Sequence, residues 1–163
     1  MEGGQKEKIM ITTIYNHCNG EKVIPSSFTT ELRLVIEEYK KTLGLYTISD
    51  FKKYLIPSIH KKGWSDEYYL DRTSKITITS IKEKTGLCIQ TGNMARMYAD
   101  LLKLQSLYSR ETITGGVLIL ATASCGRSFG GNVASYERVI RELAIFDKVI
   151  TMPLIIIGFD NEI

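Results

Sequence analysis

Residues 75–93 read KITITSIKEKTGLCIQTGN, and this stretch decides the fold class. Its first part, residues 75–79, is β-branched and alternating, which predicts a strand. A hairpin turn is expected over residues 81–85, followed by a second strand over residues 86–90. The turn-forming residues 91–93 (TGN) then break that strand. The order predicts a β-hairpin that leads directly into the next element.

The residues after the hairpin alternate helices with apolar strands. Residues 94–108 place apolar side chains at helical spacing, which predicts an amphipathic helix. Residues 117–121 and 154–159 are continuous apolar runs, as expected of strands buried on both faces. A loop over residues 122–132 and a helix over residues 135–146 are predicted between these two strands.

The N-terminal half adds one strand and two helices. Residues 9–15 are β-branched and predict a first strand. Helices are expected over residues 31–43 and 51–62. Their expected capping residues are Thr29 or Thr30 for the first helix and Ser49 or Asp50 for the second. Together these elements predict a single α/β domain over residues 1–163, with a mixed central β-sheet flanked by helices.

Composition and charge are those of a soluble globular protein. Hydrophobic residues make up 44% and charged residues 24% of the 163 residues, which excludes a disordered chain. No apolar stretch approaches the roughly 20 residues that cross a membrane, and the start of the chain lacks a signal-peptide core. We therefore expect a cytoplasmic protein without a membrane partner. The net charge of +3 means that nucleic-acid binding would depend on local basic patches.

The cysteines and histidines do not form a metal motif. Cys18, Cys88 and Cys125 are odd in number and lack CxxC spacing, which argues against a disulfide framework and against zinc. The chain has only two histidines. We expect no metal site of this kind.

Five phrases of the sequence, in this order, resemble the BglII/BstYI-type restriction endonucleases and, more distantly, BamHI. They are IYNHCNGE (14–21), LIPSIHKKGW (55–64), GLCIQTGN (86–93), SYERVIREL (135–143) and PLIIIGF (153–159). The resemblance implies the restriction-endonuclease-like PD-(D/E)XK core. Members of that family are homodimeric, Mg²⁺-dependent nucleases that cut palindromes with a GATC centre.

The resemblance also locates the catalytic positions, and their occupants are unusual. The family places an aspartate at the end of the first hairpin strand and a Glu-x-Gln or Glu-x-Glu triplet on the second. These positions fall on Thr79 and on Cys88 and Gln90 of this chain. Mg²⁺ prefers carboxylate oxygens, and a thiol prefers soft metals. The resemblance thus predicts the fold, whereas the residues argue against the activity: no cofactor is expected, and Mg²⁺ only if the protein is active.

Two residues near the site have alternative interpretations. Asp71 precedes the predicted hairpin and is either a migrated catalytic carboxylate or an ordinary loop carboxylate. Cys88 is either a reactive nucleophile or a small buried hydrophobic residue, and the inert interpretation is favoured.

The resemblance implies two base-reading segments. Asn93 occupies the position of a base-contacting asparagine and suits adenine, although an asparagine there is equally typical of a helix cap. Arg96 is a candidate phosphate contact, with a solvated surface role favoured. The loop over residues 122–132 follows a buried strand, and a loop of this length usually has a function. Its polar candidates, together with the cap of the next helix, are Arg127, Ser128, Asn132 and Ser135.

Three functional hypotheses follow. The first is a catalytically degenerate DNA-binding relative that reads a palindromic duplex as a homodimer, since a two-fold site suits a two-fold protein. The second is an active Mg²⁺-dependent type II site-specific deoxyribonuclease with rearranged carboxylates. The third is a protein-interaction module on the inherited fold.

Overall fold

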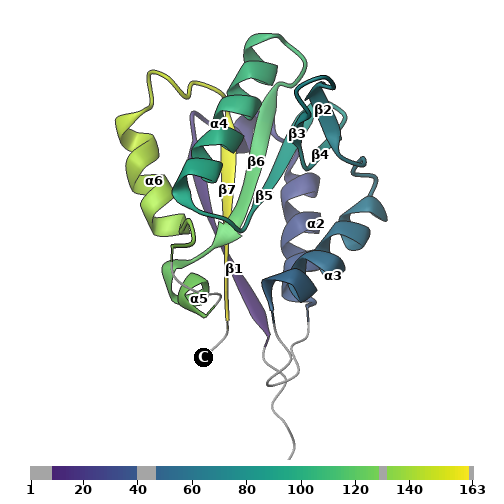
Figure 1. Ribbon diagram of the computed structural model, residues 1–163, viewed down its shortest axis with the longest axis vertical. Coiled ribbons are helices and arrows are strands. Elements are labelled where there is room, and N and C mark those ends of the chain that lie inside the picture. The colour runs from purple at the N-terminus through teal and green to yellow at the C-terminus, as the bar shows by residue number, and fades with distance from the viewer. Residues whose placement is uncertain (1–8, 40–46, 129–131, 162–163) are drawn as a thin grey trace, which may run out of the picture.

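The computed structural model describes residues 9–39, 47–128 and 132–161. A five-stranded mixed sheet has the order β1-β7-β6-β5-β4, and a separate two-stranded sheet pairs β2 with β3 (Figure 1). The strands are β1 (Met10–His17), β2 (Tyr68–Asp71), β3 (Ile76–Ile78), β4 (Ser80–Lys82), β5 (Thr85–Gln90), β6 (Gly115–Ala121) and β7 (Leu154–Asn161). Strands β5, β6 and β7 run parallel, whereas β1 and β4 pair antiparallel at the two edges. The predicted mixed central sheet is confirmed.

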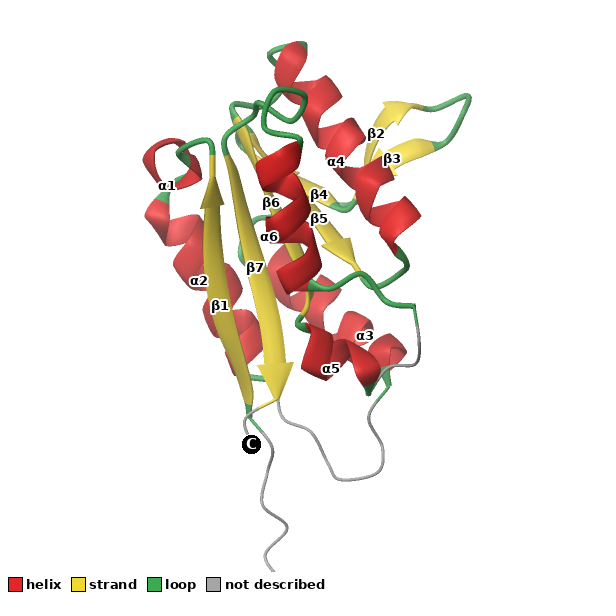
Figure 2. Ribbon diagram, turned by 90° about the vertical axis from the view of Figure 1, so that its left-hand side faces the viewer, coloured by secondary structure: helices red, strands yellow, loops and turns green. Residues whose placement is uncertain are grey.

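Helices cover both faces of the central sheet (Figure 2). They are α1 (Gly20–Val23), α2 (Ser26–Glu37), α3 (Ile48–His60), α4 (Met94–Ser109), α5 (Ala123–Arg127) and α6 (Tyr136–Ile145). One core packs α2 and α3 against alternate strand residues such as Leu87 and Ile89. The second packs α4 and α6 against the other face, which includes Cys88. The helices over residues 94–108 and 135–146 are confirmed to within about one residue.

The strand predicted over residues 75–79 is confirmed as β3, but its predicted pairing is wrong. It pairs with β2, and a separate strand, β4, begins after Thr79 and forms the hairpin with β5. The expected turn over residues 81–85 is also too long, because Ile81 pairs with Gly86. The tight turn lies at residues 83–84, and Glu83 adopts φ 51° there.

The start of α2 differs from the prediction. Its N-cap is Pro25 at φ −53°, and Thr29 is buried inside the helix, so capping by Thr29 or Thr30 is wrong. Proline suits a helix start because its φ is already helical and its missing N–H needs no partner there. The helix ends at Glu37 with Glu38 as its C-cap, so the predicted end at Leu43, itself outside the described residues, is too late.

Two further helix starts follow from side-chain caps. The N-cap of α3 is Thr47 instead of Ser49 or Asp50, and Asp50 completes a capping box with it. Thr122 accepts the backbone N–H of Cys125 at 3.2 Å and thereby starts α5. The first part of the predicted loop over residues 122–132 is therefore a short helix.

Among the described residues, no helix has both the length and the apolar character that crossing a bilayer requires.

Candidate functional site

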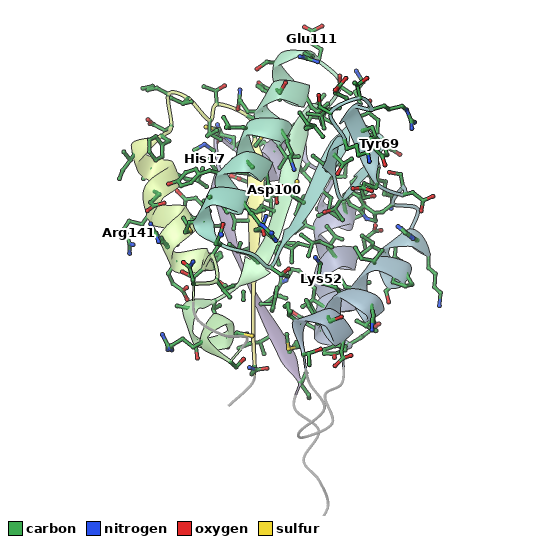
Figure 3. The ribbon with its side chains drawn as sticks, in the orientation of Figure 1. His17, Lys52, Tyr69, Asp100, Glu111 and Arg141 are labelled. Atoms are coloured by element: carbon green, nitrogen blue, oxygen red, sulfur yellow. The ribbon has the colours of Figure 1, made fainter. Side chains whose placement is uncertain are left out.

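A polar cleft lies where the β3–β4 bend, the end of β5, helix α3 and the first turns of α4 meet. Its volume is about 370 Å³. Figure 3 labels two of its lining residues, Lys52 on α3 and Asp100 on α4. The charged lining consists of Lys52, Glu67, Arg96, Asp100 and Lys103. Thr79 and Gln90, two of the three expected catalytic positions, also line it.

The Thr79 hydroxyl links the bend between β3 and β4 to strand β5. Its Oγ1 accepts a hydrogen bond from the backbone N–H of Ile89 at 3.0 Å. This bond holds the bend against the neighbouring strand. Thr79 thus has a structural role at the position where the resemblance leads us to expect a catalytic aspartate.

Cys88 is part of the hydrophobic core on the α4 and α6 face of the sheet. Its side chain is 1% exposed and packs among apolar residues of that core. Burial, followed by the charge of Asp100, raises the pKa of the thiol well above its usual value. A protonated, buried thiol is a poor nucleophile and a poor metal ligand, as the inert interpretation requires.

Gln90 uses both ends of its amide inside the protein. Its Nε2 donates to Asp100 Oδ2 at 2.6 Å, and its Oε1 accepts the backbone N–H of Gly92 at 2.6 Å. The side chain therefore joins helix α4 to the TGN turn at residues 91–93. These bonds fix the turn immediately before Asn93.

Asp100 brings into the cleft a carboxylate that we did not predict. It is buried on α4, where its Oδ1 lies 3.4 Å from Lys103 Nζ. Burial raises the pKa of this carboxyl group, and the Lys103 ammonium opposes that shift. The sequence carried a signal, because Asp100 falls three residues after Met97 and four before Leu104 on the apolar stripe of the helix. A charged residue on such a stripe marks a buried polar contact.

Asp71 does not line the cleft. It lies at the end of β2, and its Oδ2 accepts the backbone N–H of Ser74 at 2.7 Å. Hydrogen bonds from Ser74 lower the pKa of this exposed carboxyl group. Asp71 thus stabilises the turn of the β2–β3 hairpin.

Asn93 caps helix α4. Its Oδ1 accepts the backbone N–H of Arg96 at 3.1 Å, as the capping interpretation expects. An amide oxygen has a second lone pair, and the cap does not use the Nδ2 donors. Capping therefore leaves the groups that can bond adenine N6 and N7 in place.

Arg96 lies along the backbone of Gly92 at the mouth of the cleft. A Cβ at Gly92 would lie 2.7 Å from Arg96 Cδ and 2.9 Å from Gln90 Oε1. Residue 92 must therefore lack a side chain for Arg96 and Gln90 to take these positions.

The candidate DNA-contacting residues of the second base-reading segment lie on either side of residues 129–131, which are outside the described residues. Arg127 and Ser128 are exposed at the end of α5, and the Ser128 hydroxyl donates to the Cys125 carbonyl at 2.6 Å. Asn132 is exposed at φ 67°. Ser135 is the N-cap of α6 but makes no side-chain capping bond.

The two candidate base-reading segments are hydrogen-bonded to each other. The backbone N–H of Ala134 donates to the Gly92 carbonyl at 2.8 Å. At the other end of the second segment, Glu137 Oε2 accepts the Ala123 N–H at 2.7 Å. Because β5 and β6 are parallel, both segments leave the same edge of the sheet. The structure therefore brings Asn93 and Arg96 to the same edge as the second segment.

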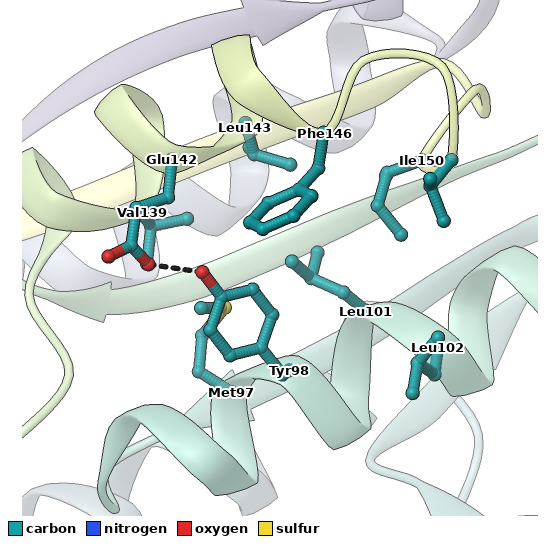
Figure 4. Close-up of a pocket in the computed structure, with 10 residues that line it drawn as sticks. Met97, Tyr98, Leu101, Leu102, Val139, Glu142, Leu143, Phe146 and Ile150 are labelled. Atoms are coloured by element: carbon teal, nitrogen blue, oxygen red, sulfur yellow. Dashed lines mark hydrogen bonds between the residues drawn. The ribbon is translucent and has the colours of Figure 1, made fainter.

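A separate apolar groove of about 130 Å³ lies between α4 and α6 (Figure 4). At its rim Tyr98 donates a hydrogen bond to Glu142, and burial together with this bond raises the pKa of Tyr98 to about 12. Three large apolar side chains that line the groove, and a fourth that precedes one of them in sequence, are 41–70% exposed. We call them the α4–α6 apolar patch: Leu102, Ile145, Phe146 and Val149.

Comparison with solved structures finds proteins with a similar fold. A crystal structure of restriction endonuclease BglII complexed with a DNA 16-mer matches with a TM-score of 0.77 and 10% identity, over 90% of this chain and 75% of that one. A crystal structure of free BglII matches with a TM-score of 0.64 and 12% identity, over 90% of this chain and 78% of that one. The fold is therefore restriction-endonuclease-like.

Comparison with curated protein sequences gives no significant match. The family model "Restriction endonuclease BglII/BglIII" matches residues 12–159, which is most of the chain. This protein therefore belongs to the BglII/BglIII family of restriction endonucleases.

Proposed function

We propose that this protein binds double-stranded DNA without cleaving it. We propose further that it acts as a single cytoplasmic domain and reads a palindromic, GATC-centred duplex as a homodimer. Family membership and the likeness to a BglII–DNA complex support DNA as the partner. One observation supports the loss of cleavage: all three side chains at the expected catalytic positions have partners inside the protein. Thr79 and Gln90 are hydrogen-bonded, and Cys88 is packed in the hydrophobic core.

The donor set of the cleft does not fit Mg²⁺. This ion takes near-octahedral oxygen ligands, usually with one or two carboxylates. Asp100 is already bonded to Gln90 and lies beside Lys103, while Glu67 Oε1 accepts a bond from the Thr77 hydroxyl at 2.5 Å. Across the described residues, no three His, Cys, Asp or Glu side chains gather as a metal-binding group.

The sheet edge at the ends of β5 and β6 supports DNA reading. The bond from Ala134 to Gly92 holds the end of the second segment beside the turn that precedes Asn93. Two backbone segments fixed against each other can present polar side chains to neighbouring bases with little ordering on binding. Asn93, Arg127, Ser128, Asn132 and Ser135 are the proposed contacts.

The α4–α6 apolar patch supports self-association. Large exposed apolar patches mark interaction surfaces, and a palindrome requires two copies related by a two-fold axis. We assign this patch to a second copy of the chain.

One observation favours a second candidate function, an active nuclease. Asp100 brings a carboxylate into the cleft beside Gln90, which occupies one of the expected catalytic positions. Asp100, rather than Asp71, is therefore the residue on which residual cleavage would depend.

A fluorescence-anisotropy titration tests the proposed function. GATC-centred duplexes should bind with Kd in the range of roughly 10⁻⁸–10⁻¹¹ M at physiological salt, and scrambled duplexes roughly 10³-fold or more weakly. The same duplexes should stay intact on gels in Mg²⁺ or Mn²⁺. Cleavage that disappears in Asp100→Asn would establish the active nuclease instead. Absence of binding at low salt would leave a protein-interaction module.

Light scattering coupled to size exclusion tests the homodimer. The wild-type protein should elute as a dimer, and Leu102→Lys should shift it to monomer by placing a charge in an apolar interface. Leu34, 50% exposed on α2, supplies the matched control, and Leu34→Lys should leave the dimer intact. A monomeric wild type, or equal effects of the two variants, would contradict the assignment.

The pH dependence of unfolding tests the environment of Asp100. Its raised pKa means that the folded state binds a proton more tightly than the unfolded state. Wild-type stability contributed by this group is present at low pH and is lost as the pH rises above the usual aspartate value of 3.8. Asp100→Asn should therefore raise the free energy of unfolding at neutral pH, and the gain should vanish toward acid pH.

Denaturant titrations of both proteins between acid and neutral pH measure this difference. The neutral-pH gain should be the same with and without Mg²⁺. A loss of stability in Asp100→Asn at neutral pH would show that the charged carboxylate is stabilising.

A further inference from the structure

We propose that Lys52 and Arg96 form a phosphate-binding pair at the mouth of the polar cleft. In this inference, which rests on the proposed DNA binding, these two side chains supply the positive charge that a metal ion supplies in an active nuclease. The ligand is a DNA backbone phosphate, and its binding needs no divalent cation.

The charges of the cleft divide into paired and unpaired groups. Lys103 Nζ lies 3.4 Å from Asp100 Oδ1, so the charges of these two groups largely compensate. Glu67 bonds Thr77. Lys52 and Arg96 line the same cleft, and neither has a hydrogen-bonded or ion-paired acid among the described residues. Three cations and two carboxylates line the cleft, a net charge of +1, and Lys52 and Arg96 are the two cations that are not ion-paired within the described residues.

The two cations come from different elements and converge on one opening. Lys52 lies on α3 and is close enough to Asp100 for its charge to lower the pKa of that carboxyl group. Arg96 lies on the first turns of α4 and runs along Gly92, which has no side chain to displace it. An ammonium group and a planar guanidinium, which bonds phosphate with two N–H groups, can then contact the same or adjacent phosphates.

One of the two carboxylates of the cleft, Asp100, is withdrawn from that opening. Asp100 is buried, and its Oδ2 is held by Gln90 while its Oδ1 faces Lys103. Glu67, the second carboxylate of the cleft, is exposed and accepts a hydrogen bond from the Thr77 hydroxyl. Phosphate contacts position the protein on the duplex without reading sequence.

The test is a salt series of anisotropy titrations in EDTA, on GATC-centred and scrambled duplexes. The wild-type protein should bind in EDTA, without any divalent cation, and added Mg²⁺ should not raise its affinity. Lys52→Ala and Arg96→Ala should each weaken binding to both duplexes and reduce the slope of log K against log salt by about 1, because each removes about one phosphate contact. Specificity, the ratio of the two affinities, should stay unchanged.

Matched controls come from neighbouring cations outside the cleft. Lys53 is exposed beside Lys52 on α3, and Arg110 is exposed at the far end of α4. Lys53→Ala and Arg110→Ala should keep the wild-type slope. Gly92→Ala keeps every charge but displaces Arg96, so it should also lower affinity and slope.

The outcomes separate this inference from the proposed function. A wild-type protein that binds no DNA overturns both. Binding that requires Mg²⁺, or slopes that Lys52→Ala and Arg96→Ala leave unchanged, overturns the phosphate-binding pair alone. Equal losses in the Lys53→Ala and Arg110→Ala controls would also overturn it, because the charge would then act without the cleft. Unfolding curves of all variants confirm that they are folded.

Discussion

The parallel strands β5, β6 and β7 are buried on both faces, and the rest of the structure follows from that constraint. Apolar side chains on each face must be covered, which places α2 and α3 on one side and α4 and α6 on the other. Parallel pairing also brings the ends of β5 and β6 to one edge of the sheet. The chain leaves that edge through the two candidate base-reading segments, which meet at the bond from Ala134 to Gly92.

The same burial determines the surroundings of the positions that were expected to be catalytic. Alternation along β5 directs Cys88 and Gln90 to the face that α4 covers. Cys88 lies far enough along the strand to be enclosed by that core, and a carboxylate there would require a metal or another partner to be stable. Gln90 ends the strand and reaches Asp100 and Gly92 instead. The polar side chains at the expected catalytic positions thus bond to other groups of the protein.

Strong periodicity made much of this predictable. The apolar stripe of α4 and the continuous runs of β6 and β7 are long patterns that few other structures satisfy. The hairpin was harder, because the alternation of residues 75–79 does not show that β3 pairs with β2, while residues 80–82, beyond the bend at Thr79, pair with β5 in the other sheet. That division depends on pairing with β2, which is a tertiary contact. The N-caps of α2 and α3 were mispredicted because residues close to Pro25 and Thr47 in the sequence are equally suitable as caps.

Within the site, sequence patterns identified positions but not partners. The capping role of Asn93 and the buried state of Cys88 were among the interpretations that the residues allowed. Asp100 was missed because its charge lies on a helical stripe that otherwise indicates only packing, and the partner that keeps it there, Gln90, lies ten residues earlier. Arg96 was assigned to the solvated surface because nothing in the sequence shows that Gly92 makes room for it beside the cleft.

We propose that the cleft contacts DNA through side-chain cations rather than through a metal ion. Calorimetric titration of Mn²⁺ into the preformed protein–DNA complex tests this most directly. Mn²⁺ takes the same kinds of oxygen ligand as Mg²⁺, and the titration gives the number of ions bound per subunit. We expect no saturable binding to the cleft and identical traces for the wild type and Asp100→Asn. One ion bound per subunit, lost in Asp100→Asn, would contradict the account and return the protein to the metal-dependent nucleases.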